Sequence, residues 1–268
     1  MVLIPAMTLS APSIGPTHHK PGHANGPGKG KGKGKGKDQD KDHAECTGGD
    51  RRHDRGPDGE RPGDRDCGTP PPAGAGEGAT VVGAFWIDAR EVSVRDYGDC
   101  VSAGKCGAAG AAAGCTASSA LGEHPITCVT RDQASAFCAW REKRLVSDVE
   151  WTAAAAGDAD RRYPWGAEVP SPERLNACGA ECATSGMYAG RDPFRTSAPG
   201  GSFPLGGTPE GVFDLAGNVA EWVDAPGGLV RGGSYADVDA SEVEAMAARS
   251  IPADAAGPTV GLRCARDP

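Results

Sequence analysis

One short segment of the sequence holds side chains that could bind a metal ion. Within residues 211–234, the polar residues Asp214, Asn218 and Glu221 stand among apolar ones, with Gly217 between them. Ca²⁺ takes six to eight oxygen ligands from carboxylates, amides and backbone carbonyls. A glycine in such a segment lets the backbone turn so that carbonyls face inward. The residue types and their spacing therefore predict a calcium-binding loop.

The same segment resembles the signature of the formylglycine-generating enzyme, or sulfatase-modifying factor, family. It reads Phe-Asp-Leu-Ala-Gly-Asn-Val-Ala-Glu-Trp over 213–222, and Arg-Gly-Gly-Ser follows over 231–234. Further stretches fit the family in the same order: residues 85–97, 124–130, 136–145, 150–151, 163–166 and 261–265. The similarity covers about residues 80–266, and several ordered motifs make it specific.

The resemblance implies a fold and one disulfide. Family members have an irregular, loop-rich α+β domain of the C-type-lectin-like kind, so we expect a formylglycine-generating-enzyme-like fold stabilised by disulfides and calcium. In that fold a cysteine of the second helix is bridged to one in the closing strand. These correspond here to Cys138 and Cys264. A second family bridge has no counterpart, because both of its cysteines are absent here.

The resemblance also implies two calcium sites. The first set of ligands corresponds to Asn176, Ala177, Asp192 and Phe194, and the second set to Asp214, Leu215, Gly217, Val219 and Glu221. For an isolated Asp or Asn, an Asx turn or a helix cap is the ordinary interpretation. Because both sets are complete, the pattern favours calcium, whose role would be to fix long loops.

The positions that carry the family's catalysis differ. A formylglycine-generating enzyme uses two cysteines shortly after the Gly-Gly-Ser motif as thiolate ligands of copper, and Cu(I) requires such soft ligands. Here those positions hold Asp237 and Glu242. Carboxylates neither bind Cu(I) well nor form a mixed disulfide, so we expect no copper and no formylglycine production.

Two functional hypotheses remain. The first is a secreted, non-catalytic domain, a pseudoenzyme, that binds an unknown protein or glycan ligand where the active site would lie. The alternative is an oxidoreductase of altered chemistry, because some cysteine-less relatives of the family are oxidases. Acidic residues 237–244 could hold a hard metal for it, but without a nearby histidine a solvated acidic loop is the favoured interpretation. Fold alone does not decide between the two.

Composition restricts the setting of the protein. Residues 1–78 carry 12 Lys and Arg against 11 Asp and Glu, which leaves 16 against 25 for residues 79–268. This acidic balance argues against nucleic acid as a partner. Ten cysteines without Cys-x-x-Cys or zinc spacing favour disulfides and an extracytoplasmic location, periplasmic, cell-surface or secreted. No apolar run is long enough for a transmembrane segment, and the N-terminus is a poor match to a signal peptide.

A change of composition near residue 79 predicts the domain organisation. Residues 1–78 are expected to be a low-complexity, mostly disordered extension, and residues 79–268 the sulfatase-modifying-factor-like domain. Residues 1–20 are either a remnant signal sequence or a divergent form of the family's opening strand. The Lys-Gly run at 28–37 could bind anionic polymers, although a solvated linker is favoured. Cys46 and Cys67 could pair with each other.

Within the domain, periodicity and capping signals predict the regular elements. We expect a strand over residues 81–87 and a helix over 94–101 that Ser93 caps. Capping boxes predict two more helices, one after Thr130 and one from Ser147 to residue 156. Between the helix over 94–101 and Thr130, an Ala/Gly-rich loop has few side chains to pack, and the cysteines that bracket it would supply order. Six cysteines of the domain have no assigned partner at this stage: Cys100, Cys106, Cys115, Cys128, Cys178 and Cys182.

Overall fold

A computed structural model describes residues 1–9, 80–179, 182 and 186–268. These residues belong to one compact unit, so the first nine residues are part of the same folded unit as the C-terminal range. The expected disorder over residues 21–78 and the pairing of Cys46 with Cys67 lie outside the described residues.

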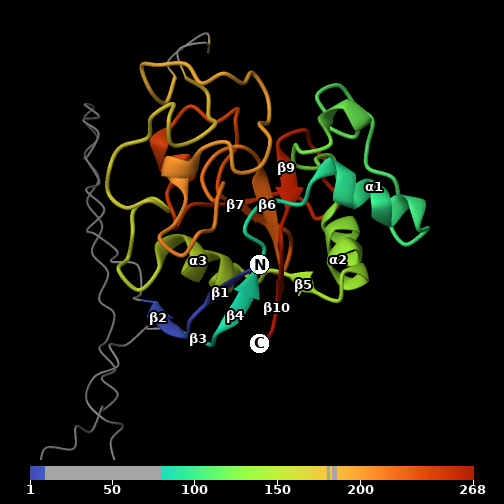
Figure 1. Ribbon diagram of the computed structural model, residues 1–268, viewed down its shortest axis with the longest axis horizontal. Coiled ribbons are helices and arrows are strands. Elements are labelled where there is room, and N and C mark those ends of the chain that lie inside the picture. The colour runs from blue at the N-terminus through green and yellow to red at the C-terminus, as the bar shows by residue number, and fades with distance from the viewer. Residues whose placement is uncertain (10–79, 180–181, 183–185) are drawn as a thin grey trace, which may run out of the picture. The chain divides into compact units, whose positions relative to one another are not determined.

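The described residues form a mixed α and β structure in which loops dominate (Figure 1). The strands are β1 Val2–Ile4, β2 Met7–Leu9, β3 Thr80–Val82, β4 Phe85–Ile87, β5 Arg144–Leu145, β6 Ala220–Val223, β7 Leu229–Arg231, β8 Ala248–Ser250, β9 Val260–Leu262 and β10 Cys264–Arg266. The helices are α1 Val94–Ser102, α2 Arg131–Trp140 and α3 Asp148–Ala156, with short 3₁₀ turns η1 Ser119–Leu121, η2 Pro204–Gly206 and η3 Ala240–Val243.

Two four-stranded sheets position the rest of the chain. The first has the order β1-β4-β10-β5 and is antiparallel throughout. The second has the order β8-β7-β6-β9, in which β6 and β9 are parallel and the other neighbours are antiparallel. Strands β9 and β10 lie next to each other in sequence but in different sheets, so the end of the chain connects the two.

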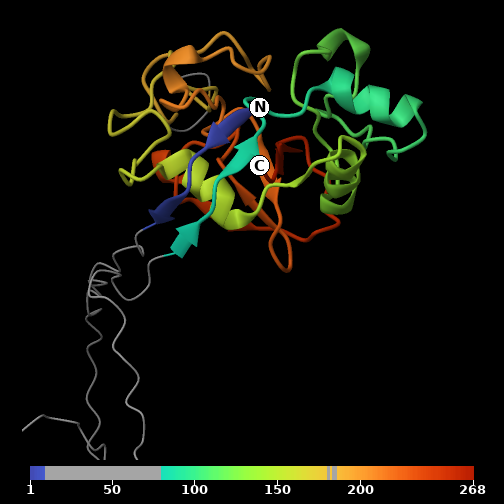
Figure 2. The same ribbon diagram turned by 60° about the horizontal axis from the view of Figure 1, so that its bottom comes forward.

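The first residues of the chain form strands, as the opening-strand interpretation requires. Strand β1 pairs with β4, and β2 pairs with β3. Figure 2 shows β1 and β4 side by side. The single strand expected over residues 81–87 is therefore two strands. The break at residues 83–84 lies opposite the break at Pro5 and Ala6, and proline has no N–H to donate to a ladder.

All three helices begin where the capping signals predict. The Ser93 hydroxyl accepts from the Asp96 N–H at the start of α1. Thr130 with Gln133, and Ser147 with Glu150, form complete capping boxes at the starts of α2 and α3. These caps satisfy N–H groups that have no partner inside the helix. The predicted helix starts are confirmed.

The helices cover different sheets. Helices α1 and α2 pack with buried residues of the second sheet, and Trp222 of β6 donates from Nε1 to the Val129 carbonyl at 2.9 Å. Helix α3 packs on the first sheet, and its Trp151 is fully buried. In Figures 1 and 2, α1 and α2 lie together, away from α3.

The eight cysteines among the described residues form four disulfides. Cys138 of α2 is joined to Cys264 of β10, consistent with the pairing that the resemblance implies. Their sequence separation is 126, and closing a loop of that length is worth on the order of 4 to 5 kcal/mol in the chain-entropy model. The other pairs, which the sequence left open, are Cys100–Cys106, Cys115–Cys128 and Cys178–Cys182.

Candidate functional site

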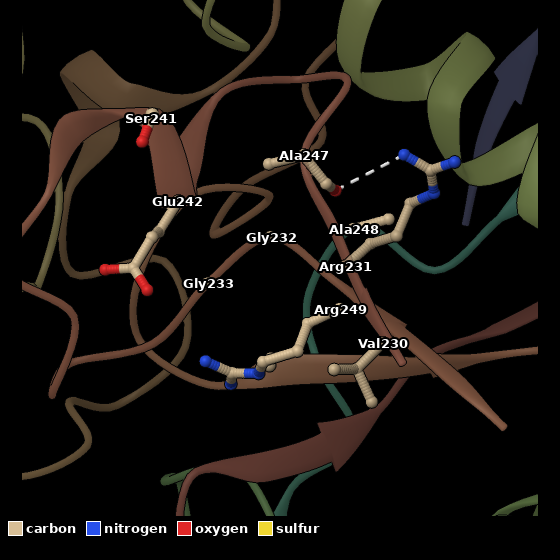
Figure 3. Close-up of a pocket in the computed structure, with 10 residues that line it drawn as sticks. Val230, Arg231, Gly232, Gly233, Ser241, Glu242, Ala247, Ala248 and Arg249 are labelled. Carbon is tan, nitrogen blue, oxygen red and sulfur yellow. Dashed lines mark hydrogen bonds between the residues drawn. The ribbon is translucent and has the colours of Figure 1, made fainter. Parts of the chain in front are cut away.

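The Gly-Gly-Ser turn that follows β7 borders a cavity of about 340 Å³. Residues of β7, η3 and β8 line it: Ala220, Val230, Arg231, Gly232, Gly233, Ser241, Glu242, Ala247, Ala248 and Arg249 (Figure 3). Gly233 has a φ of +67°, and a Cβ there would lie 2.7 Å from Val243 Cγ1 and 2.8 Å from the Glu242 carbonyl oxygen. A residue with a side chain cannot make this turn without moving η3.

Arg231 forms a wall of the cavity and does not face its interior. Its Nε donates to Asp148 at 2.6 Å, and its Nη1 donates to the carbonyls of Met246 at 3.0 Å and Ala247 at 3.3 Å. Figure 3 shows the guanidinium turned away from Glu242. Arg231 therefore joins α3 to the segment before β8.

Asp237 and Glu242, which stand where the family's catalytic cysteines are expected, play different parts. The buried Asp237 accepts from the N–H and hydroxyl of Ser234 at 2.7 and 3.1 Å, and from Arg249 at 3.3 Å. Glu242 is exposed and lines the cavity, and its carboxylate accepts a long bond of 3.4 Å from the Asp239 N–H. Asp237 thus holds the turn, while Glu242 faces the cavity.

The residues at this cavity do not fit copper(I). All eight cysteines of the described ranges are in disulfides, so none of them offers a thiolate here. The side chains that line the cavity offer a carboxylate, a hydroxyl and guanidinium groups. Cu(I) needs soft thiolate or thioether ligands, so no step of a copper mechanism can be assigned to these side chains.

The second predicted calcium set contains Glu221, which is one member of a buried ion pair. Both oxygens of Glu221 accept from Arg263, at 2.7 Å each, and one also accepts from Trp151 Nε1 at 2.8 Å. Glu221 and Arg263 are fully buried. Arg263 also donates to the Asp88 and Phe213 carbonyls, at 2.9 and 2.8 Å. The guanidinium thus supplies at Glu221 the positive charge that calcium would supply.

Two more buried carboxyl groups lie near this pair. Asp214 accepts from the Gly201 N–H at 2.6 Å, and burial raises its pKa to about 6. Glu91 accepts from the Asn218 amide at 2.6 Å and from the Val219 N–H at 3.1 Å. Burial, together with the charges of Asp214 and Glu221, raises the pKa of Glu91 well above its usual range. Burial and the neighbouring negative charges thus favour a bound proton at Asp214 and at Glu91.

Glu91 and Arg263 are functional-site candidates that the sequence reasoning did not single out. Glu91 lies in the 85–97 motif directly before the buried Val92, and Arg263 lies between the buried residues Leu262 and Cys264. A charged residue within an apolar strand requires a partner of opposite charge. That signal could have indicated an ion pair, although it could not have identified the partner.

At the first predicted calcium set, oxygen atoms crowd around one hydroxyl. The Tyr188 Oη atom lies 2.6 Å from Asp192 Oδ2, 2.8 Å from the Ala177 carbonyl oxygen and 3.3 Å from the Leu175 carbonyl oxygen. One hydroxyl hydrogen cannot serve three acceptors at once. The structure therefore brings Ala177 and Asp192 to a common, oxygen-rich point, as a calcium site requires.

The other members of this first set lie beside that point. The Asn176 amide donates to the Thr196 carbonyl at 2.8 Å and to Asn218 Oδ1 at 3.0 Å. The Phe194 N–H donates to Asp192 Oδ1 at 2.7 Å, which forms an Asx-type turn. The amide of Asn176 orients the loop, and the N–H of Phe194 orients the carboxylate.

Backbone contacts join the two sets to each other and to the cavity. The Asn218 N–H donates to the Asn176 carbonyl at 2.8 Å, and the Gly217 N–H donates to the Gly232 carbonyl at 2.8 Å. A Cβ on Gly217, where φ is +76°, would lie 2.3 Å from the Asn176 carbonyl oxygen. The remaining members of the second set, Leu215 and Val219, are buried in the same segment. This packing requires glycine at position 217.

The chain is similar to known proteins. Residues 46–268 match the family described as "Sulfatase-modifying factor enzyme 1-like domain". The chain is 37% identical over 101 residues to the formylglycine-generating enzyme of Thermomonospora curvata, a match that covers 37% of this chain and 32% of the relative. It is 33% identical over 159 residues to the inactive C-alpha-formylglycine-generating enzyme 2 of Bos taurus, covering 53% and 50%.

A third relative carries a different name. The hercynine oxygenase of Mycolicibacterium smegmatis is 34% identical over 109 residues, and the match covers 39% of this chain and 22% of the relative. The matches thus span half or less of the length of these relatives.

Solved structures agree on the fold. PvdO from Pseudomonas aeruginosa superposes with a TM-score of 0.56 at 20% identity, covering 71% of this chain and 84% of that one. Treponema denticola variable protein 1 superposes with a TM-score of 0.53 at 18% identity, covering 71% and 87%. The family match spans most of the sequence and includes every motif on which the resemblance rests, so this chain belongs to the family of sulfatase-modifying factor enzyme 1-like domains.

Proposed function

We propose that this chain is a non-catalytic binding domain whose ligand occupies the cavity beside the Gly-Gly-Ser turn. The observation that carries this proposal is the lining of that cavity, which offers Glu242, Ser241 and Arg249 but no thiol. A carboxylate, a hydroxyl and a guanidinium together can accept and donate hydrogen bonds. Such a lining suits recognition of polar groups more than the redox chemistry of a cysteine pair.

The volume and the lining of the cavity indicate the size of the ligand group that it would bind. About 340 Å³ is at the small end of ligand pockets. Val230 and two alanines, Ala247 and Ala248, give it an apolar part beside its polar groups. This combination fits one sugar ring or one amino-acid side chain of a larger partner, in keeping with a protein or a glycan as the ligand.

Support for a family member without catalysis comes from the relatives. Two of them, from Bos taurus and Mus musculus, bear the word "inactive" in their names. The C-type-lectin-like character that the resemblance implies is part of this proposal, as is an extracytoplasmic location. The four disulfides support that location, because such bonds persist in oxidising compartments. In the part of the chain that the structure describes, no helix has the length and hydrophobicity to cross a membrane.

A binding screen that compares the wild type with a variant whose cavity is filled by a larger side chain tests the proposal. The chain and its Ala248→Trp variant are screened against glycan arrays and displayed peptide libraries. Ala248 is exposed and lines the cavity, so tryptophan there should remove genuine ligands. Ala139→Trp, on the exposed face of α2, is the matched control. Ligands that Ala248→Trp binds as well as the wild type would contradict a role for this cavity.

A direct assay tests the absence of catalysis. Incubation with a sulfatase-type cysteine peptide, copper, oxygen and a thiol reductant should yield no aldehyde product by mass spectrometry. An active formylglycine-generating enzyme serves as the positive control. Turnover by this chain would overturn the non-catalytic proposal.

Calcium is part of the proposal as a structural ion at the first set of ligands. The oxygen atoms of Ala177 and Asp192 meet at one point there, and one hydroxyl hydrogen cannot serve all three acceptors around Tyr188 at once. These residues would hold the ion, and its charge would join the backbone at Ala177 to the loop at Asp192. At the second set Arg263 already neutralises Glu221, and calcium there stays a prediction that chelation tests below.

An oxidoreductase of altered chemistry is the second candidate, and the match to hercynine oxygenase favours it. Among the described residues, however, no three His, Cys, Asp or Glu side chains gather in a way that could hold a metal ion. Elemental analysis of the purified chain separates the two candidates. Calcium without a transition metal supports the binding domain, whereas stoichiometric iron or copper supports the enzyme.

A further inference from the structure

A second and larger cavity lies against α1. Its volume is about 640 Å³, and α1, the Ala/Gly-rich loop and η1 surround it. The residues that line it are Val94, Arg95, Tyr97, Gly98, Asp99, Val101, Ser102, Ala108, Ala109, Ala111, Ala117, Ser118, Gly122 and Ile126. None of them belongs to the cavity beside the Gly-Gly-Ser turn or to either calcium set.

Covalent and hydrogen bonds hold this cavity open. Cys100–Cys106 ties the end of α1 to the start of the loop, and Cys115–Cys128 ties its end to the segment before α2. Between these bridges, the Tyr97 hydroxyl donates to the Gly107 carbonyl at 2.8 Å, and the Gln133 amide donates to the Ala108 carbonyl at 2.8 Å. The Gly110 N–H donates to the Cys128 carbonyl at 2.8 Å.

These anchors act on backbone atoms, whereas the side chains of the loop are mostly hydrogen and methyl groups. The loop therefore keeps its path without filling the space beneath it. A pocket that is fixed before its ligand arrives spares the ligand the entropic cost of ordering it. The arrangement is that of a preformed binding pocket, within the usual size range for small molecules.

The lining is apolar inside and carries charge at its edge. Val94, Tyr97 and Ile126 are buried beneath the cavity, and alanines form the opposite wall. At the edge, Arg95 is paired with Glu123. Asp99 is exposed, and the described residues contain no ion pair to its carboxylate. Among the described residues, the charge at the edge without an ion-pair partner is thus the negative charge of Asp99.

From this combination we infer that the cavity binds a small amphipathic cation. Its apolar body would lie against Val101, Ala109 and the other accessible apolar side chains of the lining, and its ammonium group would lie at Asp99. Burial of the apolar body supplies the affinity. The carboxylate supplies the preference for a positive head group over a negative one. This site is independent of the binding function proposed for the other cavity.

Two probes of equal chain length and opposite charge test the inference. Decyltrimethylammonium and decanoate are titrated into the full chain by isothermal calorimetry, below the concentrations at which they form micelles. The cation should bind saturably at one site, at least tenfold more tightly than the anion. Asp99→Asn should reduce this ratio to about one, whereas Asp132→Asn, on the exposed face of α2, should leave it unchanged.

A variant with a larger side chain in the cavity gives a second and independent test. Gly98 lies within α1, and a Cβ there would meet no atom within 4 Å. Gly98→Leu therefore places a side chain in open space, and it also replaces a poor helix former. The variant should fold at least as well as the wild type and bind both probes at least tenfold more weakly. Ala139→Leu on α2 is the control.

Three outcomes would overturn the inference: absence of saturable heat with the cation, equal affinity for the anion, or unchanged binding by Gly98→Leu. Thermal unfolding of each variant accompanies the titrations. A folded Gly98→Leu variant with full affinity would place the probe elsewhere on the surface. None of these results bears on the cavity beside the Gly-Gly-Ser turn, which Ala248→Trp tests separately.

Discussion

The two predicted calcium sets contain the same kinds of oxygen ligand but neutralise their negative charge differently. At the second set, Glu221 is buried with Arg263, which donates to both of its carboxylate oxygens. At the first set, no guanidinium or ammonium group is bound to Asp192 among the described residues, and its oxygens accept from Tyr188 and the Phe194 N–H. At the second set, Arg263 of the chain itself supplies the cation. At the first set, the oxygen acceptors outnumber the donors.

This difference shows that a ligand pattern in a sequence does not specify which cation completes it. Carboxylates and carbonyls at suitable spacing suit calcium and a buried guanidinium alike, because both satisfy several oxygen acceptors at once. The choice depends on a residue that lies far away in the sequence. Arg263 is that residue for Glu221, and the following experiments compare the sets on this basis.

The largest expected effect on stability comes from breaking the ion pair of Glu221 with Arg263. Glu221→Gln removes the carboxylate that accepts two bonds from the buried Arg263 guanidinium, and breaking a buried pair by removing one partner costs about 3 to 5 kcal/mol. Urea unfolding should show that loss in the free energy of unfolding. The control, Glu244→Gln, breaks a surface pair in which Arg162 and Glu244 are 57% and 31% exposed, and should cost less than about 1 kcal/mol. Equal losses in the two variants would mean that the buried pair is unimportant.

A slightly smaller effect is expected from the pH dependence of stability. Burial raises the pKa of Asp214 from 3.8 to about 6, so the folded state binds a proton that the unfolded state has released. The stabilisation is full below the unfolded pKa and is lost as pH rises through about 6. Two pKa units correspond to about 3 kcal/mol. Asp214→Asn should lack this contribution, and the pKa of Glu91 should fall in the variant because the Asp214 charge no longer raises it.

The measurement is the difference in unfolding free energy between the wild type and Asp214→Asn from pH 4 to 8, with chelator present. The stability of the variant relative to the wild type should rise with pH. The pKa of Glu150 is lowered by its bonds with Arg144 and Ser147, and that of Glu210 by its bond with Arg161; these contributions are common to both proteins and cancel. A constant difference would show that Asp214 titrates normally.

Calcium removal should have a comparable or smaller effect at the first set. A ligand that binds only the folded state at a concentration of 100 times its Kd stabilises it by about 2.7 kcal/mol. Chelation should therefore lower the Tm of the wild type. Asp192→Asn should abolish this response, and Asp214→Asn should keep it. The reverse pattern would assign the ion to the second set, and an unchanged wild-type Tm would remove calcium from the proposal.

The smallest effect concerns the hydroxyl between the oxygens of the first set. Tyr188→Phe removes bonds to the Ala177 carbonyl and to Asp192, which should cost about 0.5 to 1.5 kcal/mol in chelator. With calcium present the cost should shrink, because the ion satisfies the same acceptors. Thermal unfolding with and without calcium provides the comparison. An equal cost under both conditions would indicate that the ion does not approach these oxygens.

Local features could be predicted from the sequence, and contacts between distant segments mostly could not. Ser93, Thr130 and Ser147 identified the helix starts because a cap involves neighbours within one turn. The resemblance also supplied the Cys138–Cys264 pair that the structure contains. In contrast, the sequence left the partners of Cys115 and Cys128 open, because several pairings are compatible with such spacing.

The candidate site shows the same limit. The motif predicted that Asp214 and Glu221 would meet at a cation, and in the structure the charge of Arg263 acts on both, but no local signal could indicate that Arg263 is this cation. Likewise the strand expected over residues 81–87 is two strands, because its pairing partner contains Pro5. Both differences arise from residues that are distant in the sequence and adjacent in space.

The position of β10 has a consequence for biosynthesis. Residues 263–266 supply the counter-charge of Glu221, the second sulfur of the Cys138 bridge and the strand between β4 and β5. A ribosome makes these residues after all the groups that they complete. While they are still in the exit tunnel, the three buried carboxyl groups lack their cation, and the first sheet lacks a central strand. The nascent domain should therefore remain open to chaperones and oxidases until translation has passed residue 266, and it should then close in one late step.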